Sequence, residues 1–247
     1  MAELRVSGRP PADPTQLRSI TVFFPCFNEQ GNIRRVVRRA VDVLEALKTD
    51  YEIILVDDGS VDDTGRIADE LADGNACVRA VHHPRNLGYG AALQSGFGAA
   101  TKDLVFYTDG DGQFDLAEMP PLLALIGEYD IVSCYRMDRR DNLARRFNGW
   151  AWTKLVQIVF SLKIRDVDCA FKLYKRSVFD DIRMESSGAL ISTEILARAV
   201  RKGYRITQRG VHHYPRTAGK QTGASPRVIL RAFRELLKLR RRILAEQ

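Results

Sequence analysis

The sequence predicts an α/β fold with a mostly parallel sheet flanked by helices, and two observations predict it. First, short apolar runs of strand length alternate with longer stretches whose apolar residues recur at helical spacing. Second, polar and acidic residues directly follow several of these runs, as they do at the carboxyl ends of strands in open α/β sheets. Because strands and helices alternate along the chain, we expect parallel neighbours joined by right-handed crossovers.

The first half of the chain carries the clearest alternation. The run 51–56 is almost continuously apolar, which is typical of a strand that is buried on both faces. The expected strands are residues 19–24, 51–56, 78–81, 104–108 and 131–133. The expected helices are residues 32–47, 64–72, 90–100 and 120–126.

The second half is less regular. Its expected elements are a helix at 143–162, a strand at 171–174, a helix at 190–202, a strand at 204–207 and a long loop at 212–225. The 247 residues, 45% of them apolar, can build a sizeable core, and no linker or internal repeat divides them. We therefore predict a flexible leader (1–18), one domain (19–225) and a basic amphipathic C-terminal helix (226–247).

The net charge of +7 implies anionic partners: phosphates, an acidic membrane surface or nucleic acid. Residues 226–247 carry seven basic and two acidic residues, and a second basic cluster lies between Arg136 and Arg146. For either cluster alone, a solvated helix face is an equally good interpretation. The chain has no recognised nucleic-acid-binding motif, and its aromatic residues are not interleaved with the basic clusters, so we do not expect a nucleic-acid partner.

The C-terminal helix leaves three partners open. Because it is amphipathic, with arginines between its apolar residues, it could lie on an anionic membrane surface, on the protein's own core or on a second subunit of a homo-oligomer. No segment offers the ~18 apolar residues that a membrane span needs. The four cysteines are far apart and form no CxxC pair, which fits a reducing compartment. We expect a cytoplasmic protein, peripheral at the inner face of the membrane if the helix binds there.

Asp109-Gly110-Asp111 directly follows the apolar run 104–107. Two carboxylates one residue apart, at the end of a buried strand, can bind a hard divalent cation that keeps its other positions for water and substrate phosphates. Gly110 lets the backbone turn sharply between the two acids. The same triplet is also ordinary turn chemistry, so its surroundings must distinguish the two interpretations.

Two further polar clusters, residues 25–29 and 57–60, also follow expected strands. Each alone could be a turn or a helix cap, with Asn32 capping the first helix and Ser60 or Asp62 the second. Because the carboxyl ends of parallel strands share one edge of a sheet, all three clusters together favour a common ligand.

The chemistry of the three clusters suggests a nucleotide. Asp57 could accept from a base N–H and Glu29 from ribose hydroxyls, while a metal on Asp109 and Asp111 would hold a diphosphate. The Gly-containing turn 85–90 would point N–H groups at an anion. This turn matches neither the P-loop nor the dinucleotide fingerprint, which speaks against an ATPase or a dehydrogenase.

Six stretches, which together span most of residues 19–225, match a known family in combination and in order. They are PCFNE (25–29), DDGSVDDT (57–64), RNLGYGAALQSGF (85–97), TDGDGQFD (108–115), RDVDCAFKLYKR (165–176) and HYPRTAGKQTG (213–223). On these residues the chain resembles the inverting family 2 glycosyltransferases, particularly the polyprenyl- and dolichyl-phosphate sugar synthases. The resemblance implies a GT-A (Rossmann-like) fold, a UDP- or GDP-linked sugar donor, Mg²⁺ or Mn²⁺, and a polyprenyl-phosphate acceptor at the membrane surface. Many such synthases carry C-terminal membrane spans and this sequence has none, so a soluble enzyme acting on a sugar or small-molecule hydroxyl is the alternative.

By position, the resemblance assigns three groups of residues. The donor site would use Pro25, Asn28, Glu29, Asp57, Asp58, Gly88 and Lys220. The metal would be surrounded by Asp109, Asp111 and Gln113. The catalytic group would contain Asp166, Asp168 and Arg216. Glu194 would lie toward the acceptor, and the choice between Asp166 and Asp168 as the acid near the reacting sugar stays open.

The expected reaction is a single in-line displacement with inversion at the anomeric carbon. The metal, with Arg216 or Lys220, would neutralise the charge that grows on the departing nucleoside diphosphate. A hydroxyl acceptor must lose a proton and would need Asp166 or Asp168 as general base. A lipid phosphate is already anionic, so the carboxylate would mainly orient it.

Overall fold

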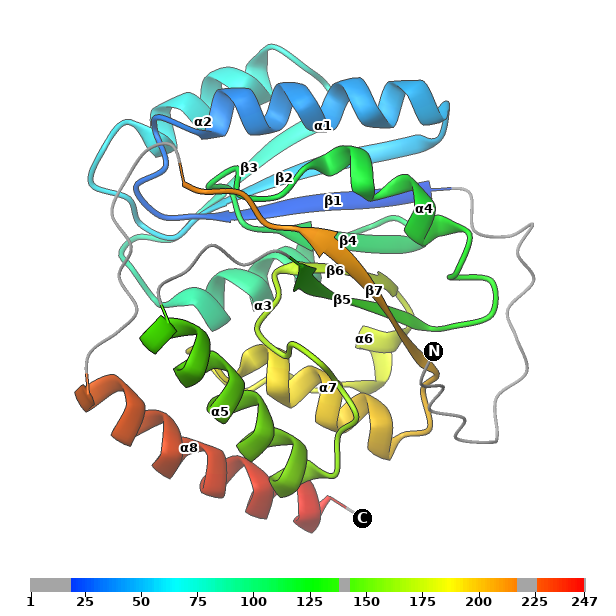
Figure 1. Cartoon of the computed structure of the whole chain (residues 1–247). Coiled ribbons are helices and arrows are strands. Elements are labelled where there is room, and N and C mark those ends of the chain that lie inside the picture. Colours follow the sequence, from blue (N-terminus) through cyan, green and yellow to red (C-terminus); the bar gives the residue numbers. More distant parts are fainter. Residues whose placement is uncertain (1–18, 138–142, 217–225, 247) are drawn as a thin grey trace.

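The computed structural model describes residues 19–137, 143–216 and 226–246, and arranges them as one sheet between two layers of helices (Figure 1). The strand order is β3-β2-β1-β4-β6-β5-β7. Neighbours are parallel except for β6, which is antiparallel to both β4 and β5. The strands are β1 (Ser19–Cys26), β2 (Asp50–Asp57), β3 (Val78–His82), β4 (Leu104–Thr108), β5 (Ile131–Met137), β6 (Phe171–Lys175) and β7 (Ile206–His212). The predicted α/β class with a mostly parallel sheet is confirmed.

Helices cover both faces of the sheet, and the buried apolar residues form one cluster on each face. The first face carries α1 (Ile33–Leu47), α2 (Thr64–Asp73), the 3₁₀ helix η2 (Leu116–Glu118) and α4 (Pro120–Leu123). The second face carries α3 (Tyr89–Ala99), α5 (Leu143–Phe160), α6 (Val178–Asp181), α7 (Ile191–Arg201) and α8 (Pro226–Ala245).

Aromatic side chains fill the core under the second face. Phe23 of β1 stacks on Tyr107 of β4 with ring centroids 5.5 Å apart, and Phe97 of α3 meets both rings edge-on. Burying each such ring contributes about 1.5–3 kcal/mol. α3 can lie this close because it carries Gly96, where a Cβ would come within 2.3 Å of the Phe23 ring. This packing fixes the position of α3, whose first residues belong to the 85–90 turn.

The sequence predicted some elements with wrong bounds and missed one. The helix expected at 120–126 is only α4, because the backbone after Leu123 continues as i→i+3 turns. The strand expected at 204–207 is β7, which runs on to His212; as an edge strand with half-exposed residues it lacks the apolar run that marks the central strands. The short helix α6 was not predicted.

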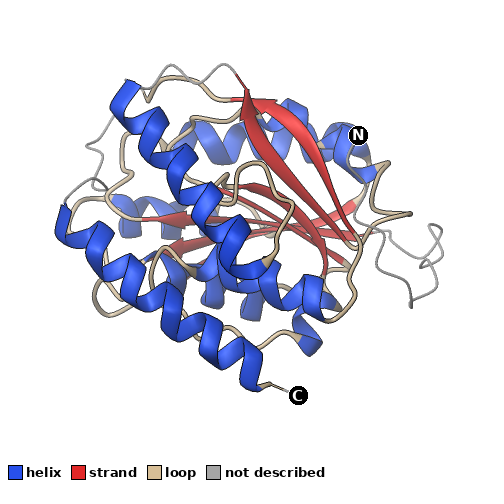
Figure 2. Ribbon diagram, turned by 60° about the horizontal axis from the view of Figure 1, so that its bottom comes forward, coloured by secondary structure: helices blue, strands red, loops and turns tan. Residues whose placement is uncertain are grey.

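The C-terminal helix α8 packs on the protein's own core. Leu236, Leu239 and Ile243 are buried within the second-face cluster, and Glu246 just beyond the helix pairs with Arg198 of α7 at 2.7 Å. Figure 2 shows α5 and α8 as two long neighbouring helices on this side. Of the three partners left open for this helix, its inner face therefore contacts the protein's own core. In the described ranges, no helix is long and apolar enough to cross a membrane.

Candidate active site

The carboxyl ends of β1, β2 and β4 meet at one edge of the sheet, and the three polar clusters follow them there. The loops after β1 and β2 are joined by hydrogen bonds. The Asn28 N–H donates to Ser60 Oγ (2.9 Å), and the Val61 N–H donates to Asn28 Oδ1 (3.0 Å). The Glu29 N–H donates to Thr64 Oγ1 (2.7 Å). Asn28 thus ties the two loops together, in a left-handed conformation with φ 57°.

The caps expected for α1 and α2 are only partly as predicted. Asn32 precedes α1, but its side chain makes no capping bond; its amide donates to Glu29 Oε2 at 2.8 Å. Asp62 accepts from the N–H of Thr64, the first residue of α2, at 3.0 Å. Asn32 thus occupies the predicted N-cap position of α1, but its side chain bonds the Glu29 carboxylate and not the helix. The N-cap residue of α2 is Asp63, so Ser60 and Asp62 as N-caps were wrong.

Asp57 and Asp58 are both buried and both accept within the protein. Asp57 accepts from the Ser60 N–H (3.0 Å) and lies 3.1 Å from Nδ1 of His82. Asp58 accepts from the N–H groups of Leu87 and Gly88 (2.9 and 3.0 Å) and lies 2.6 Å from Nδ1 of His83. Asp58 therefore pins the turn before α3 to the end of β2.

Four N–H groups in and directly after the 85–90 turn are bonded within the protein and do not face an anion site. Those of Leu87 and Gly88 donate to Asp58, and those of Gly90 and Ala91 donate to the carbonyl of Ser187 (2.9 and 3.3 Å). The predicted anion site is therefore wrong for these four groups. Gly88, at φ 101°, permits the close approach itself, since a Cβ there would lie 2.7 Å from the Ser187 carbonyl oxygen.

Asp109 and Asp111 form a partly buried carboxylate pair after β4. The Tyr89 hydroxyl donates to Asp109 Oδ1 at 3.1 Å, and the Gln113 N–H donates to Asp111 Oδ1 at 3.0 Å. Burial, with the neighbouring Asp111 charge, raises the pKa of Asp109 to about 7. Burial likewise raises the pKa of Asp111. Two carboxylates that disfavour each other's charge away from water are stabilised by a cation.

The donor atoms of this pair fit Mg²⁺ or Mn²⁺. Both cations prefer carboxylate oxygens and keep positions for water and phosphate. Within the described ranges no group of three His, Cys, Asp or Glu side chains comes together as a metal site. A cation held by Asp109 and Asp111 would therefore depend on Gln113, water or substrate oxygens for the rest of its shell.

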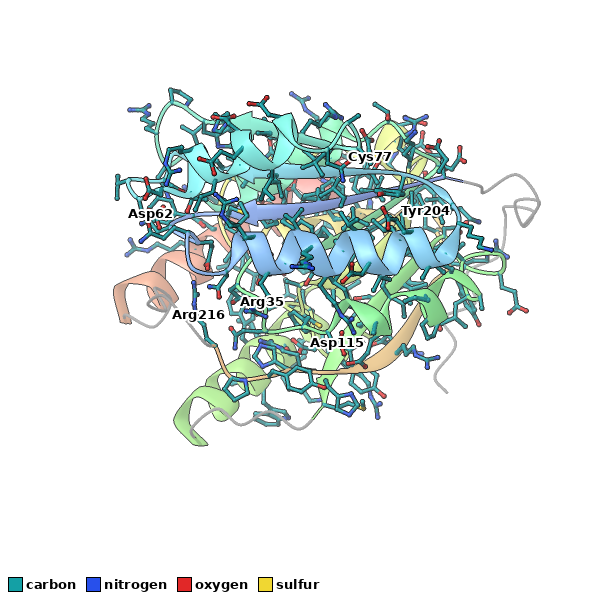
Figure 3. All side chains as sticks on the ribbon, turned by 90° about the horizontal axis from the view of Figure 1, so that it is seen from above. Arg35, Asp62, Cys77, Asp115, Tyr204 and Arg216 are labelled. Atoms are coloured by element: carbon teal, nitrogen blue, oxygen red, sulfur yellow. The ribbon has the colours of Figure 1, made fainter. Side chains whose placement is uncertain are left out.

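Arg216 joins the nucleoside side of the site to the metal side. Its guanidinium donates to Glu29 Oε1, and its Nη1 lies 3.8 Å from Asp111 Oδ2. In Figure 3, Arg216 extends from the segment after β7 toward the loop that precedes α1. Burial raises the pKa of Glu29 despite the opposing bonds from Asn32 and Arg216. Residues distant in sequence thus converge around one small acidic site.

Gln113 holds the Arg216 segment in place. Its side-chain amide donates to the Tyr214 carbonyl, and the Tyr214 N–H donates to the Gln113 carbonyl, both at 2.8 Å. The segment after β7 is therefore joined to the loop that carries Asp109 and Asp111. Gln113 as a metal ligand stays a prediction. Lys220 lies outside the described residues, and Pro25 is buried near the end of β1.

Asp166 and Asp168 lie in very different surroundings. Asp166 is buried, and both of its oxygens accept from the Arg136 guanidinium (2.7 and 2.9 Å). Burial alone would raise its pKa, but the Arg136 bonds and charge hold the pKa of Asp166 below its usual range. Asp168, two residues on, is exposed. Asp166 is thus a weakly basic partner in an ion pair, whereas Asp168 is accessible.

Three functional residues escaped the sequence analysis or were given a different role. Tyr89 contacts Asp109, and the buried Lys172 donates to carbonyls of the turn that contains Asp168. Glu194, expected toward the acceptor, is fully buried, accepts from the N–H groups of Glu185 and Ser186, and forms an ion pair with Arg198. The one available signal was Lys172 itself, a charged residue between the apolar Phe171 and Leu173.

The comparisons with known proteins agree with this geometry. The family model for glycosyl transferase family 2 matches residues 21–183, which is more than half of the chain. The chain belongs to this family. The match contains the clusters after β1, β2 and β4 and the turn with Asp166 and Asp168.

Two curated relatives are named as transferases. Over 223 residues the chain is 32% identical to the glycosyltransferase AglD of Haloferax volcanii, covering 84% of this chain and 35% of AglD. Over 166 residues it is 33% identical to the undecaprenyl-phosphate 4-deoxy-4-formamido-L-arabinose transferase of Klebsiella pneumoniae, covering 66% of this chain and 51% of that protein. The chain thus spans about a third to a half of the length of these relatives.

Solved structures of glucosyl-3-phosphoglycerate synthase from Mycobacterium tuberculosis share the fold. A complex with Mn²⁺, UDP and glucosyl-3-phosphoglycerate has a TM-score of 0.64 and 19% identity, covering 97% of this chain and 84% of that one. A UDP complex has a TM-score of 0.66 and 20% identity, covering 95% and 86%. At this identity the likeness shows the fold, and the predicted GT-A fold is confirmed.

Proposed function

We propose that this family 2 glycosyltransferase domain transfers a sugar, with inversion, from a UDP- or GDP-linked donor to a polyprenyl or dolichyl phosphate, in a metal-dependent reaction. The observation that carries the proposal is the convergence of Glu29, Asp111 and Arg216 at the edge where β1, β2 and β4 end. It brings together a carboxylate that can accept hydrogen bonds from a ribose (Glu29), a carboxylate that can bind a metal (Asp111) and a cation that can bind phosphate (Arg216). The name of the Klebsiella relative, an undecaprenyl-phosphate transferase, supports this acceptor class.

The donor would lie along the three loops. Glu29 and Asp57 would offer carboxylate oxygens to the ribose and the base, next to Pro25; each Asp57 oxygen has one partner in the protein and keeps a second lone pair for the base. Asn28, Asp58 and Gly88 act by fixing the backbone around it, because their polar groups are already bonded within the protein. The loops are therefore shaped before a donor arrives, which lowers the ordering cost of binding.

The diphosphate would lie at the metal end. Asp109, Asp111 and Gln113 would hold Mg²⁺ or Mn²⁺, which when bound supplies Lewis-acid stabilisation of the departing diphosphate. Arg216 would move its guanidinium from Glu29 and Asp111 to the phosphate oxygens, where it forms charge-assisted hydrogen bonds. Lys220 follows four residues later, and we assign it the same phosphates.

In the displacement, an acceptor oxygen forms the new bond to the anomeric carbon. The bond from that carbon to the diphosphate oxygen breaks, and its electron pair leaves with the nucleoside diphosphate. A phosphate acceptor attacks as an anion, so Asp168 would orient it, while a hydroxyl acceptor would pass its proton to Asp168. Asp166 is unsuited to either task because Arg136 holds both of its oxygens.

The outer side of α5 and α8 would bring the enzyme to its lipid. We call this the α5/α8 face; its exposed apolar residues are Trp150, Ile158, Leu237 and Leu244. Exposed arginines and lysines of α8 surround the two leucines, namely Arg234, Lys238, Arg240, Arg241 and Arg242. Apolar anchors among cations suit the anionic inner surface of a membrane.

Liposome flotation tests this attachment. The wild-type protein should float with phosphatidylglycerol vesicles and not with phosphatidylcholine vesicles. Leu237→Glu on the α5/α8 face should reduce flotation severalfold. The matched control Val61→Glu, which makes the same charge change at an exposed residue far along the chain, should not. Equal flotation of all three proteins, or association with a second subunit through this face, would remove the membrane role.

One observation favours the alternative, a soluble enzyme acting on a hydroxyl. The exposed Asp168 could take the proton that a hydroxyl acceptor must lose, whereas a phosphate acceptor needs no general base and would only be oriented by Asp168. Incubation of UDP- and GDP-sugars with Mn²⁺ or Mg²⁺, with and without a short polyprenyl phosphate, separates the two functions. Lipid-dependent release of the nucleoside diphosphate supports our proposal. Release that requires a sugar or small-molecule hydroxyl supports the alternative, and no release under any condition contradicts both.

A further inference from the structure

Lys172 is a fully buried cation next to the candidate active site. It lies on β6 directly opposite Tyr107 of β4, near the end of β4 that Asp109 follows. Its ammonium lies 5.6 Å from the centre of the Tyr107 ring. Burying an ammonium is costly unless its donors are satisfied, so an apolar side chain would be the cheaper choice at this point of an aromatic core.

The ammonium donates to a single turn and to the strand beside it. Nζ donates to the carbonyls of Val167 (3.1 Å) and Cys169, and it lies 3.4 Å from the Tyr107 hydroxyl. An ammonium has three donors, and these three acceptors match that number. The two carbonyls flank Asp168, so Lys172 holds the backbone on both sides of the exposed carboxylate.

The same turn is held from its other side. Arg136 binds both oxygens of Asp166, one residue before Val167. The turn therefore stands between two cations, the buried Lys172 on its carbonyls and the partly buried Arg136 on its first carboxylate. Phe171, three residues after Asp168, pairs with Thr108 of β4, the residue before Asp109, so the strand pairing brings the turn to the Asp109 end of the site.

We propose that Lys172 is a positioning residue, which fixes the 166–169 turn so that Asp168 faces the acceptor beside Asp109. This inference rests on the proposed function for the role of Asp168, but the clamp on the turn does not. Displacing a reacting group by about 1 Å can cost about 10²-fold in rate, so the clamp would act on turnover more than on donor binding.

The test compares Lys172→Met with Lys175→Met. Both lysines are buried on β6, but Lys175 lies at the other end of the strand, paired with Asp130 at 2.9 Å. Both variants remove a buried cation from the same strand, so loss of fold stability alone would affect them alike. Hydrogen exchange of the full chain should show the amides of residues 167–170 exchanging on the order of tenfold faster in Lys172→Met only.

Turnover and binding give the second readout. With UDP-glucose, Mn²⁺ and a short polyprenyl phosphate, Lys172→Met should lower kcat on the order of 10²-fold and change the Mn²⁺-dependent Kd of UDP less than threefold. In an Asp168→Asn background the Lys172→Met effect on kcat should vanish, because the two residues act through one group.

The outcomes separate two failures. Unchanged exchange of residues 167–170 in Lys172→Met, or the same change in Lys175→Met, overturns the positioning role. Faster exchange confined to Lys172→Met, in a protein that shows no transfer with these probes, supports the clamp and counts against the proposed function. A kcat loss of equal size in the Asp168→Asn background shows that Lys172 acts by another route, and overturns the inference.

Discussion

The donor side and the acceptor side of the site are held by different forces. The loops after β1 and β2 are joined by short hydrogen bonds between backbone N–H groups and side chains of the neighbouring loop. The turn 166–169 is held instead by two cations, Arg136 of β5 and Lys172 of β6. The donor side is thus held mainly by neutral hydrogen bonds, whereas the turn on the acceptor side depends on charged groups.

This difference predicts how the two sides respond to substitution. Neutral hydrogen bonds contribute about 1 kcal/mol each to stability, so a substitution that removes one of them has a small effect. A buried ion pair that loses one partner leaves an uncompensated charge, which costs several times more. Substitutions should therefore lower the free energy of unfolding less on the donor loops than on the acceptor side.

The largest effect is expected at Arg136. Arg136→Met leaves the Asp166 carboxylate buried without its partner and should lower the free energy of unfolding by about 3–5 kcal/mol. Urea denaturation measures this loss. The double variant Arg136→Met, Asp166→Leu removes both charges and should recover most of it. If the double variant is no more stable than the single one, the acceptor side is not held by this pair.

A smaller effect concerns pH. Only the deprotonated carboxylate binds a metal, and the pKa of Asp109 is raised to about 7. Mn²⁺ affinity should therefore be constant above about pH 7 and fall by up to about tenfold per pH unit below it. Tyr89→Phe removes a hydrogen bond that favours the charged carboxylate, so the midpoint should move to higher pH. Calorimetric titration that shows one affinity from pH 5.5 to 7.5 would contradict this.

The smallest effect is expected on the donor side. Asn28→Ala removes the bond from the Val61 N–H and places alanine at a φ of 57°, which together should cost about 1–2 kcal/mol. Asn28→Gly removes the same bond but accepts this φ, so it should be the more stable of the two. Thermal unfolding of the two variants measures the difference. A loss as large as that of Arg136→Met would abolish the contrast between the two sides.

Prediction from the sequence succeeded where local signals suffice. β1, β2 and β4 are apolar runs followed by polar residues, so the three strands and the shared edge of Glu29, Asp57 and Asp109 could be predicted. β7 was placed too early because an edge strand lacks an apolar run. The 85–90 turn was expected to offer N–H groups to an anion, but Asp58 and the Ser187 carbonyl accept them. Such long-range pairings leave no local pattern, and the same is true of Arg136 with Asp166.

The central claim is that one site joins a nucleotide to a metal through Asp111. Isothermal titration of UDP and GDP, with and without Mn²⁺, into the wild type, Asp111→Ala and the control Asp115→Ala tests it most directly. Asp115 belongs to the same loop and caps η2, accepting from the Ala117 N–H. We predict that one of the two nucleotides binds only with Mn²⁺, that Asp111→Ala loses this binding by on the order of 10²-fold or more, and that Asp115→Ala keeps it. Nucleotide binding that is independent of Mn²⁺, or unchanged in Asp111→Ala, would contradict the account.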